Sequence, residues 1–102
     1  MPFVAAITVY LHFGDSGSLK AKRKELTSLR SVLNRRFGAA VAEVDHQDLW
    51  QRSTLALALV ASSASDLDHL ADAVGRYLEN RHPDSVRIER RLVSFADLDV
   101  GV

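Results

Sequence analysis

Apolar side chains alternate with others from Phe3 to Phe13, which is the period of a β-strand. The turn-forming residues 14–17 follow, and Ser18 can cap a helix that starts directly after them. Within this helix apolar residues return at helical spacing until Gly38, a common helix end. They are Leu19, Leu26, Leu29, Leu33 and Phe37. The pattern therefore predicts a strand and then an amphipathic helix.

Two more strands, a second helix and a last strand follow from the same reasoning. Residues 39–45 are extended by pattern, residues 49–61 form a longer strand, and the short polar stretch between them is a hairpin connection. Ser65, which precedes acidic residues, is expected to start the second helix, because carboxylates near a helix start favour its dipole. The buried stripe of that helix is Leu67, Leu70, Ala71, Val74 and Leu78. Residues 80–84 contain a proline and end the helix, and residues 85–95 predict the last strand.

The order strand, helix, strand, strand, helix, strand is that of the α+β ferredoxin-like fold βαββαβ, a four-stranded antiparallel sheet with two helices on one face. Right-handed crossovers place the first and third strands in the centre of that sheet. The chain of 102 residues, 47% of them hydrophobic, has the length of one domain with one core. We expect a single ferredoxin-like domain over residues 1–96 and a C-terminal tail over residues 97–102.

Composition narrows the classes of function. Lysine plus arginine and aspartate plus glutamate number 13 each, so the whole-chain charge supports neither a nucleic-acid nor a membrane role. Basic residues nevertheless gather between Ser18 and Arg36, against the single acid Glu25. The chain has no cysteine, which excludes disulfides, thiolate metal sites and cysteine catalysis and fits a reducing compartment. Its apolar N-terminal segment has the features of neither a signal peptide nor a membrane span, and we expect a cytoplasmic protein without a membrane partner.

Side-chain size assigns the residues of each strand to the two faces of the sheet. The leucines of residues 55–59 are bulkier than their neighbours, so they and Leu49 should face the helices. Glu43 and Asp45 should turn to the open face with Val41, because carboxylates are seldom buried. The other residues expected on the open face are Thr8, Tyr10, His12, Trp50, Arg52, Thr54, Arg87, Glu89, Arg91, Val93 and Phe95.

Chain direction brings polar residues of several strands to one edge of the sheet, because the first strand ends where the third strand, the fourth strand and the first helix begin. We predict a binding site for RNA or another anion at this edge. Its residues on the strands and the hairpin are Tyr10, His12, His46, Gln47, Asp48, Trp50, Arg52 and Arg87. The first helix adds Lys20, Lys22, Arg23 and Lys24 in its opening turns. The helix dipole disfavours cations there, so a bound anion would offset an unfavourable charge arrangement.

Each part of this site has a plainer interpretation. The lysines can form a solvated charged face, and Trp50 can serve in packing or in a subunit contact. Glu43, Asp45 and the arginines of the sheet can form cross-strand ion pairs. A metal site at His12 and His46 has no supporting ligand spacing, and hairpin carboxylates make a poor acid/base pair. We therefore expect no metal, no cofactor and no enzymatic activity.

Two segments of the chain resemble a known family. They are SLKAKR at residues 18–23 and VAEVDHQDLWQR at residues 41–52, and similar segments occur in the YlxP-like bacterial domain of unknown function. The resemblance covers nearly the whole chain, which departs from the family by having Ala21 where glutamate is common and by an extension after Phe95. It implies a small bacterial cytoplasmic protein of ferredoxin-like fold, often encoded near translation and ribosome-maturation factors, with no established activity.

Two functions from different classes fit the sequence. The first is an RNA- or ribosome-associated binding protein in which Tyr10, Trp50 and His12 stack on bases while basic residues hold phosphates. The second is a homo-oligomeric module, such as a homodimer, or another protein-binding module that uses the open sheet face without nucleic acid. Acylphosphatases share the topology but need a positioned asparagine, and the two asparagines here, Asn34 and Asn80, are predicted on helices.

Overall fold

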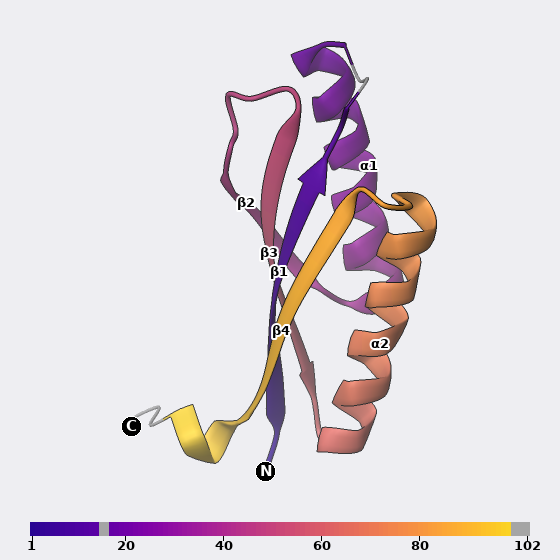
Figure 1. Ribbon diagram of the computed structural model, residues 1–102. Helices are drawn as coiled ribbons and strands as arrows, with labels where there is room; N and C mark the ends of the chain where they lie inside the picture. The colour runs from indigo at the N-terminus through magenta and orange to yellow at the C-terminus, as the bar shows by residue number, and fades with distance from the viewer. Residues whose placement is uncertain (15–16, 99–102) are drawn as a thin grey trace.

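A four-stranded antiparallel sheet carries two helices on one face, in a computed structural model that describes residues 1–14 and 17–98 (Figure 1). The elements in chain order are β1 (Phe3–His12), α1 (Leu19–Phe37), β2 (Ala40–Asp45), β3 (Arg52–Ala61), α2 (Ala64–Arg81), β4 (Val86–Ser94) and the short 3-10 helix η1 (Phe95–Leu98). The strand order β2-β3-β1-β4 confirms the predicted ferredoxin-like arrangement, with β1 and β3 in the centre. Residues 15 and 16 of the predicted turn and residues 99–102 of the predicted tail lie outside the described residues. No helix of the described part is long and apolar enough to cross a membrane.

Serine caps and a glycine set the ends of the helices. The Ser18 hydroxyl accepts a hydrogen bond from the Ala21 amide at 3.0 Å, as predicted for the start of α1. The helix ends where Gly38 adopts the left-handed region, with φ of 69°. The predicted start of α2 is wrong by two residues, because Ser63 rather than Ser65 is the cap. Ser63 lies three residues before Asp66, which is the spacing that a serine cap requires. The Ser63 hydroxyl accepts a hydrogen bond of 3.1 Å from the Asp66 amide.

Leucines dominate the core between the sheet and the helices. The buried apolar side chains are Ala5, Ile7, Val9 and Leu11 of β1, Leu26, Leu29 and Leu33 of α1, Leu55, Leu57 and Leu59 of β3, Leu67, Ala71, Val74 and Leu78 of α2, and Ala39. Most of the predicted helix stripes are therefore confirmed, but Phe37 and Leu70 are only partly buried, and Leu19 at the first position of α1 is exposed. Burying one leucine stabilises a fold by roughly 1.5–3 kcal/mol, so this layer is what holds both helices against the sheet.

The connection between β2 and β3 is longer than predicted. Pairing of β3 with β1 begins at Arg52 opposite His12, so Leu49 and Trp50 belong to the hairpin and not to the strand. The expectation that Leu49 points inward is wrong, since its side chain is 48% exposed. A turn in which the Leu49 amide donates to the His46 carbonyl at 3.2 Å replaces the strand pairing there. Phe95 likewise falls outside β4, at the start of η1.

Glu43 and Val41 face the helices and not the open side of the sheet. Glu43 lies opposite Leu55 in the register of β2 with β3, and Val41 lies opposite Leu57. Because paired residues of an antiparallel sheet share a face, the predicted orientation of these two side chains is wrong. A register shift between Glu43 and Asp45 then returns Asp45 to the open face, as expected.

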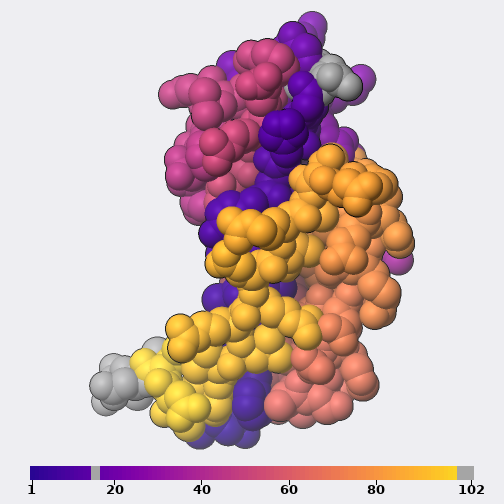
Figure 2. All heavy atoms as spheres, in the orientation of Figure 1, coloured from indigo at the N-terminus to yellow at the C-terminus, as the bar shows by residue number. Residues whose placement is uncertain are grey.

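The face of the sheet away from the helices grades from apolar to polar along the strands. The cross-strand register gives four rows. The first is Val60, Val4 and Val93, and the second is Ala40, Ala58, Ala6 and Arg91. The third is Ala42, Ala56, Thr8 and Glu89, and the fourth is Asp45, Thr54, Tyr10 and Arg87. Arg52 and His12 follow as a last pair. We call this surface the open face, its valine row the apolar end and its Tyr10 row with Arg52 and His12 the polar end. Figure 2 shows side chains of β1 reaching the surface between the hairpin and β4.

Candidate functional site

Four of the predicted site residues meet at the polar end of the open face. Tyr10 lies opposite Arg87 in the register of β1 with β4, and His12 lies opposite Arg52 in the register of β1 with β3. All four line one surface pocket. The remaining lining residues are Leu11, Asp84, Ser85 and Val86. The predicted convergence of these strands is therefore observed, and Trp50 is not among the lining residues of this pocket.

Arg87 stacks on Tyr10 within this pocket. The carbon at the centre of its guanidinium group lies 4.0 Å from the centroid of the phenol ring, which is close enough for a cation–π interaction. The Arg87 guanidinium also pairs with the exposed carboxylate of Glu89. These two contacts hold a planar cation against the sheet, and the Arg87 side chain remains exposed to solvent.

Lys22 is the predicted site residue whose position differs most from the expectation. It is only 1% exposed, so it does not join its basic neighbours on the solvent side of α1. Its ammonium group donates to the His46 carbonyl at 2.6 Å and to the Leu49 carbonyl. The sequence held a signal for this, because Lys22 precedes Leu26 and Leu29 at the four- and seven-residue spacing of the buried stripe. The charge of this side chain is used inside the protein, to hold the hairpin.

Glu43 completes the surroundings of Lys22. Its carboxylate lies 3.5 Å from the Lys22 ammonium and accepts a hydrogen bond from the Ser53 hydroxyl at 2.9 Å. The Glu43 side chain is 13% exposed, and a carboxylate in such a place needs an opposite charge and a hydrogen-bond donor. Lys22 supplies the charge and Ser53 the donor, which explains why Glu43 can face the helices.

The hairpin residue His46 has a fixed place on the open face. Its backbone adopts a left-handed conformation with φ of 63°. The His46 amide donates a hydrogen bond of 2.8 Å to the Asp45 carboxylate. Its ring nitrogen Nδ1 lies 3.0 Å from the Thr54 hydroxyl, and Thr54 is buried although it belongs to the open face. Among the described residues no group of three His, Asp or Glu side chains is placed to hold a metal ion. Through its contact with Thr54, the His46 side chain connects the hairpin to β3.

The other predicted residues lie on the surface around this corner. Gln47 and Asp48 are exposed at the tip of the hairpin, and Trp50 is partly exposed beside them. The exposed basic side chains in the first turns of α1 are Lys20, Arg23 and Lys24. The first turns of α1, the hairpin and the end of β1 all lie at the same end of the molecule (Figure 1). Of the predicted anion site, every residue except Lys22 thus has access to solvent.

An ion-pair network between the two helices was not predicted. Arg81 of α2 donates two hydrogen bonds of 2.9 Å to the Glu25 carboxylate of α1 and one of 2.8 Å to the Ser28 hydroxyl. His82 Nε2 lies 2.8 Å from the same carboxylate, within ion-pair distance but outside hydrogen-bond geometry. Burial raises the pKa of Glu25, but the hydrogen bonds and charge of Arg81, together with the nearby His82, outweigh it and hold that pKa below its usual value. The hydrogen bond with Glu25, opposed by burial, raises the pKa of Arg81.

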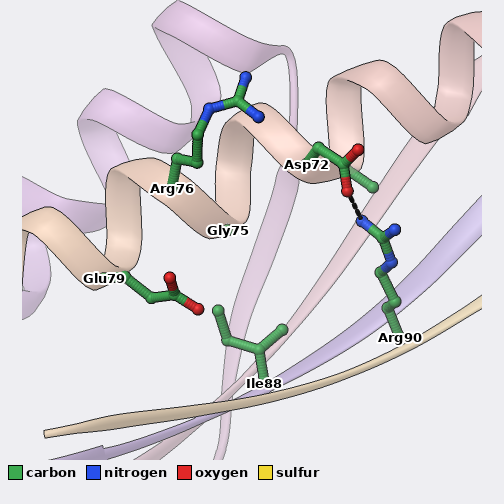
Figure 3. A pocket seen from close by; sticks show the side chains of 7 residues that line it. Asp72, Gly75, Arg76, Glu79, Ile88 and Arg90 are labelled. Carbon is green, nitrogen blue, oxygen red and sulfur yellow. Dashed lines mark ion pairs between the residues drawn. The ribbon is translucent and has the colours of Figure 1, made fainter. Parts of the chain in front are cut away.

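A second surface pocket lies between α2 and the edge strand β4 (Figure 3). Gly75 leaves its helix side open above Ile88, and Arg90 crosses the pocket from β4 to α2. The Arg90 guanidinium is 2.7 Å from the Asp72 carboxylate and 3.1 Å from that of Asp68. Because Arg90 is already paired with two carboxylates, it is a weak ligand for an anion in this pocket.

Comparison with solved structures supports the fold alone. The de novo designed protein Foldit4 aligns with a TM-score of 0.63 over 92% of this chain and 98% of its own, at 9% identity. SnoaB, a cofactor-independent oxygenase from Streptomyces nogalater, aligns with a TM-score of 0.50 over 90% of this chain and 91% of its own, at 8% identity. At such identities the likeness extends to the fold and to no activity.

Comparison of sequences identifies the family. An uncharacterised protein, YlxP of Bacillus subtilis (strain 168), is 39% identical over 49 residues, which are 48% of this chain and 53% of that protein. The matched region thus spans about half the length of this curated relative. The family model described as "Protein of unknown function (DUF503)" matches residues 4–91, which include both motifs and the whole sheet except its first residue, Phe3, and residues 92–94. The chain therefore belongs to the YlxP-like DUF503 family of proteins of unknown function.

Proposed function

We propose that this protein is a cytoplasmic RNA-binding protein, acting on single-stranded RNA such as an exposed segment of ribosomal RNA, and that the polar end of its open face is the contact surface. The observation that carries the proposal is the Arg87 guanidinium stacked 4.0 Å over the Tyr10 ring, in one pocket with His12 and Arg52. A planar cation backed by an aromatic ring is suited to stack on an unpaired base.

The groups around this platform match the other parts of a nucleotide. Arg52 and His12 line the same pocket as the stacked Arg87 and Tyr10 side chains and can donate hydrogen bonds to phosphate oxygens. Asp84 and Ser85 line the same pocket and can accept hydrogen bonds from the amino groups of a base edge. A single strand is the form of RNA that exposes both base face and base edge to such a surface.

The exposed side chains Lys20, Arg23 and Lys24 extend the positive charge beyond the pocket. They lie on the first turns of α1, at the end of the molecule where β1 ends (Figure 1), and residues Tyr10, Leu11 and His12 of that part of β1 line the pocket. A strand that leaves the pocket toward α1 would keep its phosphates near cations, and each such contact makes binding more sensitive to salt. Because the net charge of the chain is zero, electrostatic attraction to RNA has to come from such local groups of cations.

Fluorescence anisotropy with labelled single-stranded oligonucleotides tests the proposal. We expect Arg52→Glu and Arg87→Ala each to raise the Kd about tenfold, and Arg52→Glu also to reduce the salt dependence of binding. Arg35→Glu, at an exposed position near the C-terminal end of α1, is the matched control and should bind as the wild type does. Absence of binding by the wild type, or equal loss in Arg35→Glu, contradicts the proposal.

A further inference from the structure

Small side chains of β2, β3 and β1 make up the centre of the open face, with Arg91 and Glu89 of β4 beside them, and no further layer covers it in the described part of the chain. Ala58 lies between Ala40 and Ala6 in the cross-strand register, and Ala56 lies between Ala42 and Thr8. The two long helices α1 and α2 lie on the other side of the sheet, whereas η1 follows the end of β4 on the side away from them (Figure 1). At the apolar end Val60 is 59% exposed, beside the half-buried Val4 and Val93. An apolar surface of this extent is typical of a contact with another protein.

We propose that a second copy of this chain packs face to face on the open face, so that the two sheets form the inner layers of a homodimer. Sheets that pack face to face lie about 10 Å apart with their strands nearly aligned. Alanine side chains leave such a surface flat, and a flat apolar surface is complementary to a second copy of itself. RNA bases and phosphates, in contrast, gain little from alanine and valine side chains, so the apolar end fits protein better than nucleic acid.

The area of the open face is sufficient for a dimer. β1 and β3 have 10 residues each, β4 has 9 and β2 has 6. With about 3.3 Å per residue and about 4.8 Å between strands, the face covers roughly 550 Å² on each copy. Two copies together would bury roughly 1,100 Å², which is above the threshold of about 1,000 Å² for a specific interface and just below the usual range of stable ones. The full face, including its polar end, is therefore needed for the contact.

The gradient along the strands determines how the two copies are oriented. A two-fold axis parallel to the strands places each row against the same row of the partner, so valines meet valines and polar residues meet polar residues. The alternative axis, across the strands, would place the valine row against the row of Tyr10 and Arg87. The first arrangement also puts β2 of one copy over β4 of the other. Asp45 then lies opposite the partner's Arg87, and the two-fold axis repeats this opposite-charge pair.

Sedimentation equilibrium over a wide concentration series tests the dimer. The mass should rise from the monomer value of 11.3 kDa to twice that value, and Ala58→Glu should stay monomeric because it buries a charge in the contact. Ala21→Glu makes the same change at an exposed position of α1 and should associate as the wild type does. A wild type that remains at 11.3 kDa at the highest concentration, or an Ala58→Glu that associates equally well, overturns the proposal.

A charge exchange tests the orientation and does not depend on the folding of Ala58→Glu. Asp45→Arg alone and Arg87→Asp alone should each weaken association about tenfold or more, because each places like charges across the contact. The double variant exchanges the two charges and should recover most of the loss. Failure of the double variant to recover, or a mass beyond the dimer, overturns the two-fold arrangement along the strands.

Discussion

The ammonium group of Lys22 lies 3.5 Å from the carboxylate of Glu43, and this pair joins the two sequence segments that mark the family. Lys22 belongs to residues 18–23 at the start of α1, and Glu43 belongs to residues 41–52, which form β2 and the hairpin. The same ammonium group donates to two hairpin carbonyls. The two segments therefore act as one structural unit, in which a buried cation fixes the loop that carries His46 and Trp50.

Replacing Lys22 should destabilise the protein far more than replacing its neighbours. Lys22→Met keeps most of the volume but leaves Glu43 and the His46 and Leu49 carbonyls without their donor. We expect a loss of about 3–5 kcal/mol in the free energy of unfolding, measured by urea denaturation. Lys24→Met, at an exposed position of the same helix, should change it by less than about 0.5 kcal/mol.

A second variant separates the two roles of Lys22. Lys22→Met combined with Glu43→Met removes the unpaired carboxylate but still leaves both hairpin carbonyls without a donor. It should therefore recover only part of the lost stability. Full recovery would show that the carbonyl hydrogen bonds contribute nothing. Equal stability of Lys22→Met and Lys24→Met would contradict the anchoring role altogether.

Acid should weaken the contact between the helices through Glu25. The pKa of Glu25 is lower in the folded protein than its usual value of 4.5, so its ionised form stabilises the fold at and above that pH. This contribution is lost as the pH falls through the folded-state pKa. Glu25→Gln should cost about 1–2 kcal/mol at neutral pH and should flatten the pH dependence of urea unfolding below pH 4.5. Glu79→Gln, at an exposed position of α2, should leave that pH dependence as steep as in the wild type.

Replacing Gly38 and Gly75 by alanine should change the free energy of unfolding in opposite directions. Neither would bring an added Cβ within 4 Å of another atom, so the backbone alone decides the effect. Gly38 has φ of 69°, where alanine is strained, and Gly38→Ala should lower the free energy of unfolding by about 1 kcal/mol. Gly75 lies inside α2, and Gly75→Ala should raise it by about 0.5–1 kcal/mol. Urea denaturation measures both, and a change of the same sign in the two variants would contradict this account.

The fold could be predicted because its signals are repeated along the chain. Leu26, Leu29 and Leu33 return at helical spacing, and alternation assigns β1 and most of β3 to two faces. Each such element is specified by several residues, so an error at one position leaves the element unchanged. The start of α2 shows the limit, since two serines lie close together and only the geometry of the amide of Asp66 selects Ser63.

The orientation of Glu43 could not be predicted from its own strand, because a partner distant in sequence decides it. A lone carboxylate would avoid the helix side, and only the burial of Lys22 makes that side favourable. The wrong predictions for Lys22, expected at the surface, and for Glu43, expected on the open face, thus have one cause. The helical spacing from Lys22 to Leu26 could have revealed it. The convergence of Tyr10, His12, Arg52 and Arg87 was predictable, since chain direction and register suffice to place them together.

RNA and a second copy of the chain should compete, because both proposed contacts use the polar end of the open face. The dimer places the partner's Asp45 against Arg87, the same group that would stack on a base. By linkage, a ligand that binds only the monomer shifts the equilibrium away from the dimer. Adding a single-stranded oligonucleotide to the wild-type dimer should therefore lower the sedimenting species to one chain with bound RNA. Arg52→Glu, which lies outside the row of Asp45 and Arg87, should still dimerise and should need about ten times more oligonucleotide for the same response. RNA that sediments with an intact dimer would contradict the competition, even if both associations occur.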